Sequence, residues 1–180
     1  MILLLSGASH TGKTAFAQKL MEKSGYPYLS LDHLKMGLIR SGQTSLAPES
    51  PDRALTDYLW PIAREISKTA IENGQNLIIE GCYIPFDWKN HFGQLYLEQI
   101  RYLCLIMDEA WIKRHWQDIC SHADDIEKRL YDSAFSPEIA IEDNRYFLKG
   151  CIEHGLNYLL VSEEYPDKLD LGMFASQNLG

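Results

Sequence analysis

A glycine-rich stretch near the start of the chain carries the clearest chemical signal in the sequence. Residues 6–14 read S-G-A-S-H-T-G-K-T, which contains the spacing G-x-x-x-x-G-K-T. Backbone N–H groups of such a turn point at phosphate oxygens, and the start of the following helix adds partial positive charge. The lysine reaches the β- and γ-phosphates, and the threonine hydroxyl binds Mg²⁺. The expected phosphate-binding residues are Gly7, Ser9, His10, Thr11, Gly12, Lys13 and Thr14.

The segments on either side favour a functional loop over a chance match. Residues 2–5 form an apolar run suited to a buried parallel strand, and residues 15–23 have the pattern of a helix. A phosphate-binding loop joins a strand to a helix in this way. We therefore expect a nucleoside triphosphate, ATP, bound together with Mg²⁺. The side chain of His10 is assigned no role of its own.

Three acidic residues each follow a further apolar run: Asp32, Glu80 and Asp108. In an open parallel sheet, ligands bind beyond the carboxyl ends of the strands, so these carboxylates are expected near the phosphate-binding loop. We expect Asp32 to orient an acceptor hydroxyl, as a base or by position alone; the alternative is a helix N-cap. Glu80 is expected to hold Mg²⁺, directly or through water, unless it is an exposed anion at a strand end. Asp108, with Glu109, is better explained as the start of a helix.

Basic residues flank two segments that we expect to move. The polar, turn-rich residues 41–52 are predicted to form a mobile acceptor loop, and residues 114–129 a lid. Arg114 and Arg129 of the lid are candidates to stabilise the transferring phosphate. The candidate acceptor-binding residues are Asp32, Arg40, Arg53 and Glu80. The alternative for each arginine is a solvated side chain or a favourable cation at a helix C-terminus.

Five apolar runs alternate with helical patterns along the chain. The predicted strands are residues 2–6, 28–31, 76–80, 102–107 and 158–161. This alternation predicts an α/β fold, with a parallel sheet covered by helices on both faces and all 180 residues in one domain. The predicted helices include one from Pro51 that is kinked or split at Pro61, one over 109–121, a short one over 124–131, and one from Pro137 to about Gly155.

Composition sets further limits. The net charge of −8 gives no global basic field to attract a long nucleic acid, and the longest apolar runs are strand-sized, too short to cross a membrane. The four cysteines form no C-x-x-C pair, which favours reduced thiols. The strand predicted at residue 2 leaves no room for a signal peptide. We therefore expect a cytoplasmic protein without a membrane partner, and the charge disfavours a nucleic-acid partner.

Together these motifs resemble the P-loop small-molecule kinases, the group of adenylate, shikimate and gluconate kinases with the zeta-toxin and chloramphenicol phosphotransferase branch. The resemblance lies in Gly7 to Thr14, in Leu31-Asp32 and in Arg40. It implies a P-loop NTPase three-layer sandwich with a small lid, with Asp32 and Arg40 at the acceptor. Residues 79–85, I-E-G-C-Y-I-P, are similar to the E-G-x-x-x-P stretch of 2-phosphoglycerate kinases. They replace the D-G-F-P-R stretch of adenylate kinases, which argues against AMP as the acceptor.

The leading hypothesis is transfer of the ATP γ-phosphoryl group to a small-molecule acceptor, either a metabolite hydroxyl or a nucleotide phosphate. A regulatory P-loop ATPase or nucleotide switch is the first alternative, although the sequence has no N-K-x-D string of the kind that GTPases use for base recognition. A polynucleotide 5′-end kinase is the second, and the acidic balance disfavours it. The sequence leaves open the acceptor, ATP versus GTP, and the oligomeric state.

Overall fold

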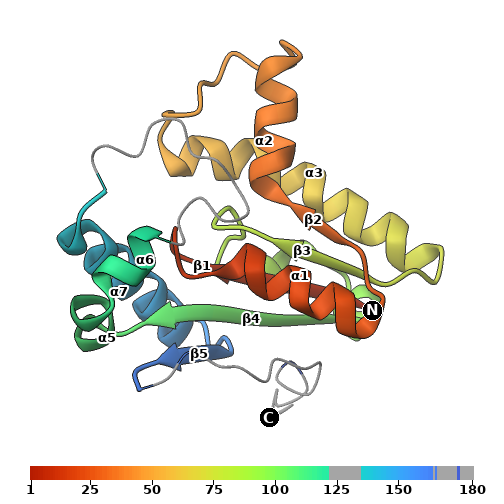
Figure 1. Ribbon diagram of the computed structural model, residues 1–180. Helices are drawn as coiled ribbons and strands as arrows, with labels where there is room; N and C mark the ends of the chain where they lie inside the picture. Colours follow the sequence, from red (N-terminus) through yellow and green to blue (C-terminus); the bar gives the residue numbers. More distant parts are fainter. Residues whose placement is uncertain (122–134, 164, 166–173, 175–180) are drawn as a thin grey trace.

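Five short apolar segments pair as parallel strands in a single sheet (Figure 1). The computed structural model describes residues 1–121, 135–163, 165 and 174. Within this part of the chain the strand order is β2-β3-β1-β4-β5. The strands are β1 (Ile2–Gly7), β2 (Tyr28–Ser30), β3 (Leu77–Glu80), β4 (Ile100–Met107) and β5 (Tyr158–Val161). Each lies close to its predicted bounds, so the predicted five-stranded parallel sheet is confirmed.

The central strand β1 is buried along its whole length. Leu4 pairs with Ile79 of β3 on one side and with Tyr102 of β4 on the other. A strand that is covered on both faces must be apolar on both, and this is why β1 is a continuous apolar run rather than an alternating pattern. Its end lies in the middle of the carboxyl edge of the sheet, and the phosphate-binding loop begins there.

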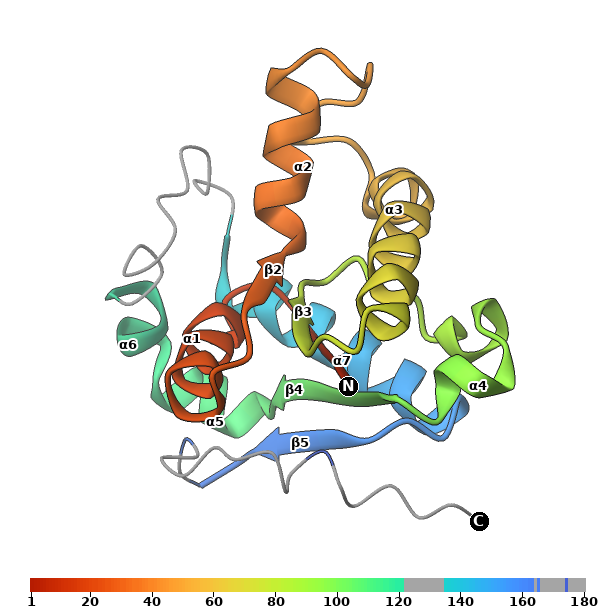
Figure 2. The same ribbon diagram turned by 90° about the vertical axis from the view of Figure 1, so that its right-hand side faces the viewer.

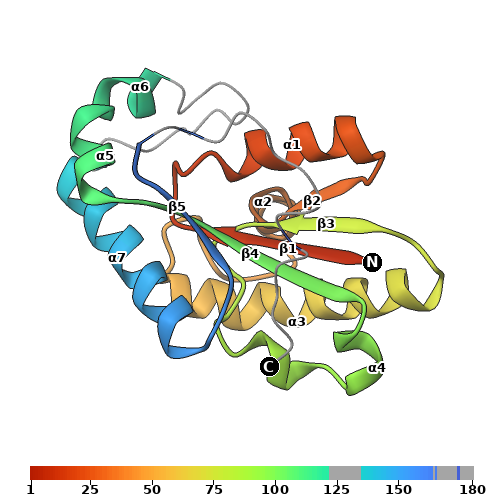
Figure 3. The same ribbon diagram turned by 90° about the horizontal axis from the view of Figure 1, so that it is seen from below.

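Helices cover both faces of the sheet and complete three layers (Figure 3). Leu3 and Leu5 of β1 belong to a core cluster with α1 (Lys13–Ser24). The alternate residues of β1 belong to a larger cluster with α3 (Asp52–Glu72) and α7 (Pro137–Glu153). The remaining helices are α2 (Leu31–Arg40), the 3-10 helix η1 (Trp88–His91), α4 (Gln94–Leu97), α5 (Glu109–Arg114) and α6 (Trp116–Ser121).

Helix α3 is continuous over its 21 residues. Of the kink or split predicted at Pro61, the split does not occur, because Leu55 and Ala63 hold both sides of the exposed proline in the core. The helix begins at Asp52, one residue later than predicted, and Pro51 occupies the cap position. Neither α3 nor any other helix in the described residues is long and apolar enough to cross a membrane.

The segment after β4 differs more from the prediction. The single helix expected over residues 109–121 is two short helices, α5 and α6. His115 between them leaves the helical conformation, and its ring stacks on Trp111 with 4.5 Å between the centroids. The Asp108 side chain accepts a hydrogen bond from the Trp111 N–H at 2.6 Å, so the predicted helix start is confirmed. The short helix expected over 124–131, and Arg129 of the lid, lie outside the described residues.

Asn144 joins α7 to the end of β4. The helix begins as predicted, with Ser136 as its N-cap and Pro137 as its first residue. Asn144 is 2% exposed; its Oδ1 accepts a hydrogen bond from the Met107 N–H at 2.8 Å, and its Nδ2 donates to the Ala140 carbonyl at 2.8 Å. Both bonds lie in the interior, where an unsatisfied polar group is costly. The amide therefore fixes α7 against the carboxyl end of β4.

We expect Asn144→Leu to lower the free energy of unfolding by about 1–3 kcal/mol, because the substitution leaves the Met107 N–H buried without its partner. Urea denaturation read by tryptophan fluorescence measures this change. Lys149→Leu, on an exposed part of the same helix, is the matched control and is expected to shift the free energy by no more than about 0.5 kcal/mol. Equal denaturation midpoints for the two variants would contradict the role given to Asn144.

Candidate active site

The phosphate-binding loop leaves β1 and enters α1 through two glycines with positive φ. Gly7 has a φ of 143° and Gly12 a φ of 80°, values that residues with side chains rarely adopt. A Cβ atom on Gly7 would collide with the Leu105 carbonyl oxygen, and one on Gly12 with the Tyr165 hydroxyl. Only glycine fits these two positions. The loop can therefore follow the tight path that turns its N–H groups toward a bound phosphate.

Lys13 lies inside this loop rather than in solvent. The residue is 6% exposed, and its Nζ donates a hydrogen bond to the Ala8 carbonyl oxygen at 2.6 Å. Thr11 Oγ1 donates to the same oxygen at 3.0 Å. A neutral carbonyl binds an ammonium group less strongly than an anion does. Lys13 is therefore placed to exchange this bond for one to a phosphate oxygen.

Thr14 and Glu80 meet where the start of α1 approaches the end of β3. Thr14 Oγ1 donates a hydrogen bond to Glu80 Oε1 at 3.3 Å, and Glu80 is 1% exposed, so it is not the exposed anion that was the alternative. Mg²⁺ prefers such oxygen ligands and is usually held by one or two of them together with phosphates and water. The described residues contain no larger cluster of potential metal ligands. The pair fits a Mg²⁺ ion that is shared with a nucleotide.

Asp32 forms an ion pair that the sequence analysis missed. It lies in the first turn of α2, where Ser30 occupies the cap position, so the alternative N-cap role is wrong. Its Oδ1 accepts a hydrogen bond from Lys35 Nζ at 2.7 Å, and the same ammonium donates to the Tyr83 hydroxyl at 2.9 Å. Burial raises the pKa of Tyr83, so the phenol stays neutral. The i,i+3 spacing of Asp32 and Lys35 is visible in the sequence, but no local pattern indicates the contact with Tyr83.

The predicted arginines do not gather at one point. Helix α2 stands away from the sheet, and Arg40 is exposed at its outer end (Figure 2). Arg53 is exposed in the first turn of α3, with its Nε 4.0 Å from Asp57 Oδ2. Arg114 Nη2 donates a hydrogen bond to the Ser162 carbonyl just after β5, at 2.5 Å. Contacts of these arginines with an acceptor or a phosphate stay predictions.

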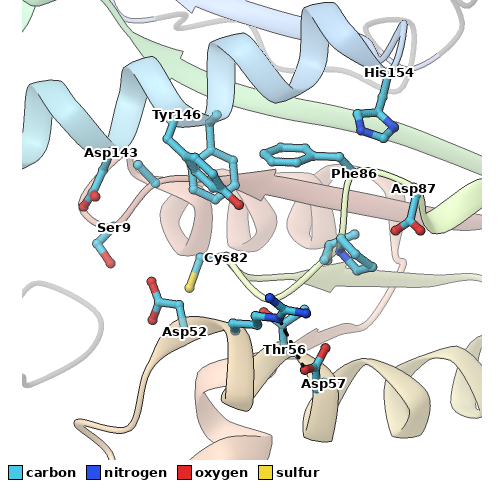
Figure 4. A pocket seen from close by; sticks show the side chains of 15 residues that line it. Ser9, Asp52, Thr56, Asp57, Cys82, Phe86, Asp87, Asp143, Tyr146 and His154 are labelled. Atoms are coloured by element: carbon cyan, nitrogen blue, oxygen red, sulfur yellow. Dashed lines mark ion pairs between the residues drawn. The ribbon is translucent and has the colours of Figure 1, made fainter.

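A cleft of about 440 Å³ opens beside the phosphate-binding loop (Figure 4). Its walls come from the loop itself, the first turns of α3, the segment after β3, and α7 with the residue that follows it. The side chains around it include Ser9, Asp52, Cys82, Phe86, Asp143 and Tyr146. Pockets of this size accommodate small organic molecules.

Cys82 lines this cleft close to Asp32 and its partners. Burial, together with the Asp32 and Asp52 carboxylates, raises the pKa of its thiol to about 11, and the Lys13 and Lys35 ammonium groups act in the opposite direction. The next residue, Tyr83, accepts a hydrogen bond from the Lys35 ammonium that also pairs with Asp32. The cleft, Asp32 and the phosphate-binding loop therefore adjoin one another.

Two aromatic contacts support the loop from outside. The Tyr165 hydroxyl donates a hydrogen bond to the Thr11 carbonyl at 2.9 Å, and burial raises the Tyr165 pKa to about 12, which keeps the donor proton in place. The His10 ring stacks on Phe135 with 3.9 Å between the centroids. These partners are more than a hundred residues away in sequence, so nothing local indicates either contact.

This sheet order, with a glycine-rich loop between the central strand and α1, defines a P-loop NTPase fold. A candidate kinase from Chloroflexus aurantiacus has the same fold, with a TM-score of 0.55 and 17% identity over 97% of this chain and 92% of its own. A shikimate kinase from Bacteroides thetaiotaomicron has a TM-score of 0.54 and 12% identity over 93% of this chain and 89% of its own. A sugar kinase from Janibacter sp. has a TM-score of 0.51 and 14% identity over 92% and 86%.

The structural neighbours are thus small-molecule P-loop kinases, as the motifs predict. No protein-family model and no curated protein matches the chain. At these low identities the likeness concerns the fold, and the acceptors of the neighbours are not transferred to this chain.

The raised pKa of Cys82 predicts slow alkylation at neutral pH even though the side chain borders an open cleft. Only the thiolate reacts, so the rate with iodoacetamide is expected to rise about tenfold for each pH unit up to about pH 11. Mass spectrometry of peptides quenched at successive times measures the rate, with the exposed Cys120 as an internal reference and Cys82→Ser to confirm the assignment. Rapid modification of Cys82 that does not change between pH 7 and 9 would contradict the burial of this thiol.

Proposed function

We propose that the protein is a kinase that transfers the γ-phosphoryl group of ATP, in the presence of Mg²⁺, to a small-molecule acceptor. The observation that carries the proposal is the cleft of about 440 Å³ that opens at Ser9 of the phosphate-binding loop. A kinase needs room for a second substrate beside the phosphates, whereas a nucleotide switch or ATPase needs only the nucleotide and water. The fold shared with small-molecule kinases supports the same conclusion.

The loop residues would bind the triphosphate and neutralise its charge. Backbone N–H groups between Gly7 and Lys13 would donate to the phosphate oxygens, and Lys13 would leave the Ala8 carbonyl to contact them. Mg²⁺, when bound, supplies positive charge between the β- and γ-phosphates. Thr14 and Glu80 are the residues that would hold it. These contacts favour a transition state in which negative charge spreads over the transferring group.

Asp32 would position the acceptor. Its carboxylate accepts a hydrogen bond from the Lys35 ammonium at 2.7 Å, which restricts its orientation. In a loose phosphoryl-transfer transition state the attacking hydroxyl needs orientation more than early deprotonation. We infer that Asp32 accepts a hydrogen bond from the acceptor hydroxyl, and that Lys35 and Tyr83 hold the carboxylate in place for this contact.

The acceptor is inferred to be a metabolite rather than a nucleic-acid end. The cleft has four aspartates on its walls, which would repel a phosphodiester backbone. A cytoplasmic location is part of the same proposal, and the free state of all four cysteines supports it.

Substitution of the loop lysine tests nucleotide binding. We expect Lys13→Met to weaken the binding of a non-hydrolysable ATP analogue with Mg²⁺ by about tenfold or more, because a buried ammonium that contacts the phosphates is lost. Isothermal titration calorimetry measures the affinity. Lys19→Met, an exposed position on the same helix, is the matched control and should bind like the unchanged protein. If the two variants bind equally well, Lys13 does not contact the nucleotide.

Substitution of Asp32 tests phosphoryl transfer. With ATP labelled in the γ-phosphate and a pool of metabolites, the unchanged protein should label an acceptor, and Asp32→Ala, which removes the hydrogen-bond acceptor, should reduce that transfer about a hundredfold or more. The affinity for MgATP should stay the same, because Asp32 is assigned to the acceptor alone. Glu22→Gln on the exposed side of α1 provides a control for the loss of one negative charge. ATP hydrolysis that only another protein stimulates, without a labelled metabolite, would favour a nucleotide switch.

A further inference from the structure

The charged side chains of the cleft are predominantly acidic. Four aspartates line it, against a single arginine. Arg53 lies 4.0 Å from Asp57, and His91 Nε2 lies 3.6 Å from Asp87, so two of the four aspartates have a basic neighbour. Within the described part of the chain, Asp52 and Asp143 have neither an ion pair nor a hydrogen bond. The negative charge of the cleft is therefore concentrated on these two residues.

Asp52 and Asp143 lie at the same end of the cleft, beside the phosphate-binding loop. Figure 4 shows Asp52 of α3 and Asp143 of α7 on either side of Ser9. Burial raises the pKa of Asp143, and the charges of Asp52 and Glu142 raise it further. Two carboxylates brought together by different helices repel each other, and a cation between them removes that repulsion. This end of the cleft thus favours a positively charged group.

Beside Asp143, the wall of the cleft becomes aromatic (Figure 4). Phe86 and Tyr146 lie with their ring centroids 5.3 Å apart, and Phe147 lies 5.6 Å from Phe86. All three rings line the cleft, and Tyr146 is 63% exposed. Aromatic faces attract organic cations and cover carbon skeletons, but they do not coordinate a small hydrated metal ion well. Since no group of three or more potential metal ligands occurs in the described ranges, an organic cation fits this cleft better than a metal ion.

We propose that the phosphoryl acceptor is a hydroxyl compound with a cationic amine, whose ammonium group lies between Asp52 and Asp143. This inference rests on the proposed kinase function and specifies the substrate class. Arg40 and Arg53, as predicted acceptor-binding residues, would instead favour an anionic acceptor. Cys82 borders the cleft, and the next residue, Tyr83, shares the Lys35 ammonium with Asp32, so we place a hydroxyl of the same small molecule at Asp32. Transfer would form an O–P bond at that hydroxyl and break the O–P bond to the leaving ADP, while the hydroxyl proton passes late in the step to Asp32 and from there to solvent.

Compounds of similar size that carry a cationic, a neutral or an anionic group test the proposal. One set is glucosamine, glucose and glucuronate, and a smaller set is ethanolamine, ethylene glycol and glycolate. Each is titrated by calorimetry into the protein saturated with the non-hydrolysable ATP analogue and Mg²⁺. We expect an amine to bind about tenfold or more tighter than its neutral counterpart, and the acids to bind most weakly.

Two variants connect this preference to the carboxylates. Asp52→Asn and Asp143→Asn are each expected to weaken amine binding about tenfold, and the double variant to abolish the preference for the amine. Glu98→Gln, an exposed residue before β4, removes the same charge away from the cleft and should leave amine binding unchanged. All variants are first titrated with the ATP analogue alone, and all are expected to bind it normally.

The outcomes separate the two proposals. If the unchanged protein does not bind the ATP analogue, the proposed kinase function fails. If it binds the analogue but neither amine, or binds the neutral or acidic compounds as well as the amines, only the cationic acceptor is overturned. The same holds if the aspartate variants retain the full preference for the amine.

Discussion

The site depends on one steric constraint at the end of the central strand. The backbone between β1 and α1 passes so close to the Leu105 carbonyl that Gly7 leaves no room for a side chain, and Gly12 has a positive φ that residues with side chains rarely adopt. β1 is held by neighbours on both sides, so this turn cannot move away from them without breaking the sheet. The same turn directs Lys13 back toward the Ala8 carbonyl. The phosphate-binding geometry is thus a consequence of the packing at the centre of the sheet.

Two opposite charges are buried close to this turn. Lys13 is 6% exposed and Glu80 is 1% exposed, and each would be costly in an apolar interior without polar partners. The Ala8 carbonyl and the Thr14 hydroxyl provide such partners. An ammonium and a carboxylate held in this way match a ligand that combines anionic phosphates with a divalent cation. The buried ammonium and carboxylate are therefore complementary in charge to the proposed nucleotide and its Mg²⁺ ion.

The two acidic regions around the loop differ in how their charge is balanced. On α2, Asp32 has the Lys35 ammonium at 2.7 Å, and the pair is further fixed by Tyr83. Between α3 and α7, Asp52 and Asp143 line the cleft without an ion pair among the described residues. The first region can orient a neutral hydroxyl, whereas the second attracts positive charge. The proposed acceptor carries the hydroxyl and the positive charge on one molecule. The two acidic regions would therefore fix the orientation of the acceptor in the site.

The sequence by itself determined the strands, the glycine-rich loop and the helix starts at Asp108 and Ser136, because these depend on neighbouring residues. It also placed Asp32 and Glu80 at one edge, since parallel strands end on the same side. It allowed a split at Pro61, where packing keeps α3 continuous, and it missed the contact of Lys35 with Tyr83, which lie 48 positions apart. Only the tertiary structure decided that Asp52 of α3 and Asp143 of α7 face one cleft, because that proximity arises from two helices packed on the same face of the sheet.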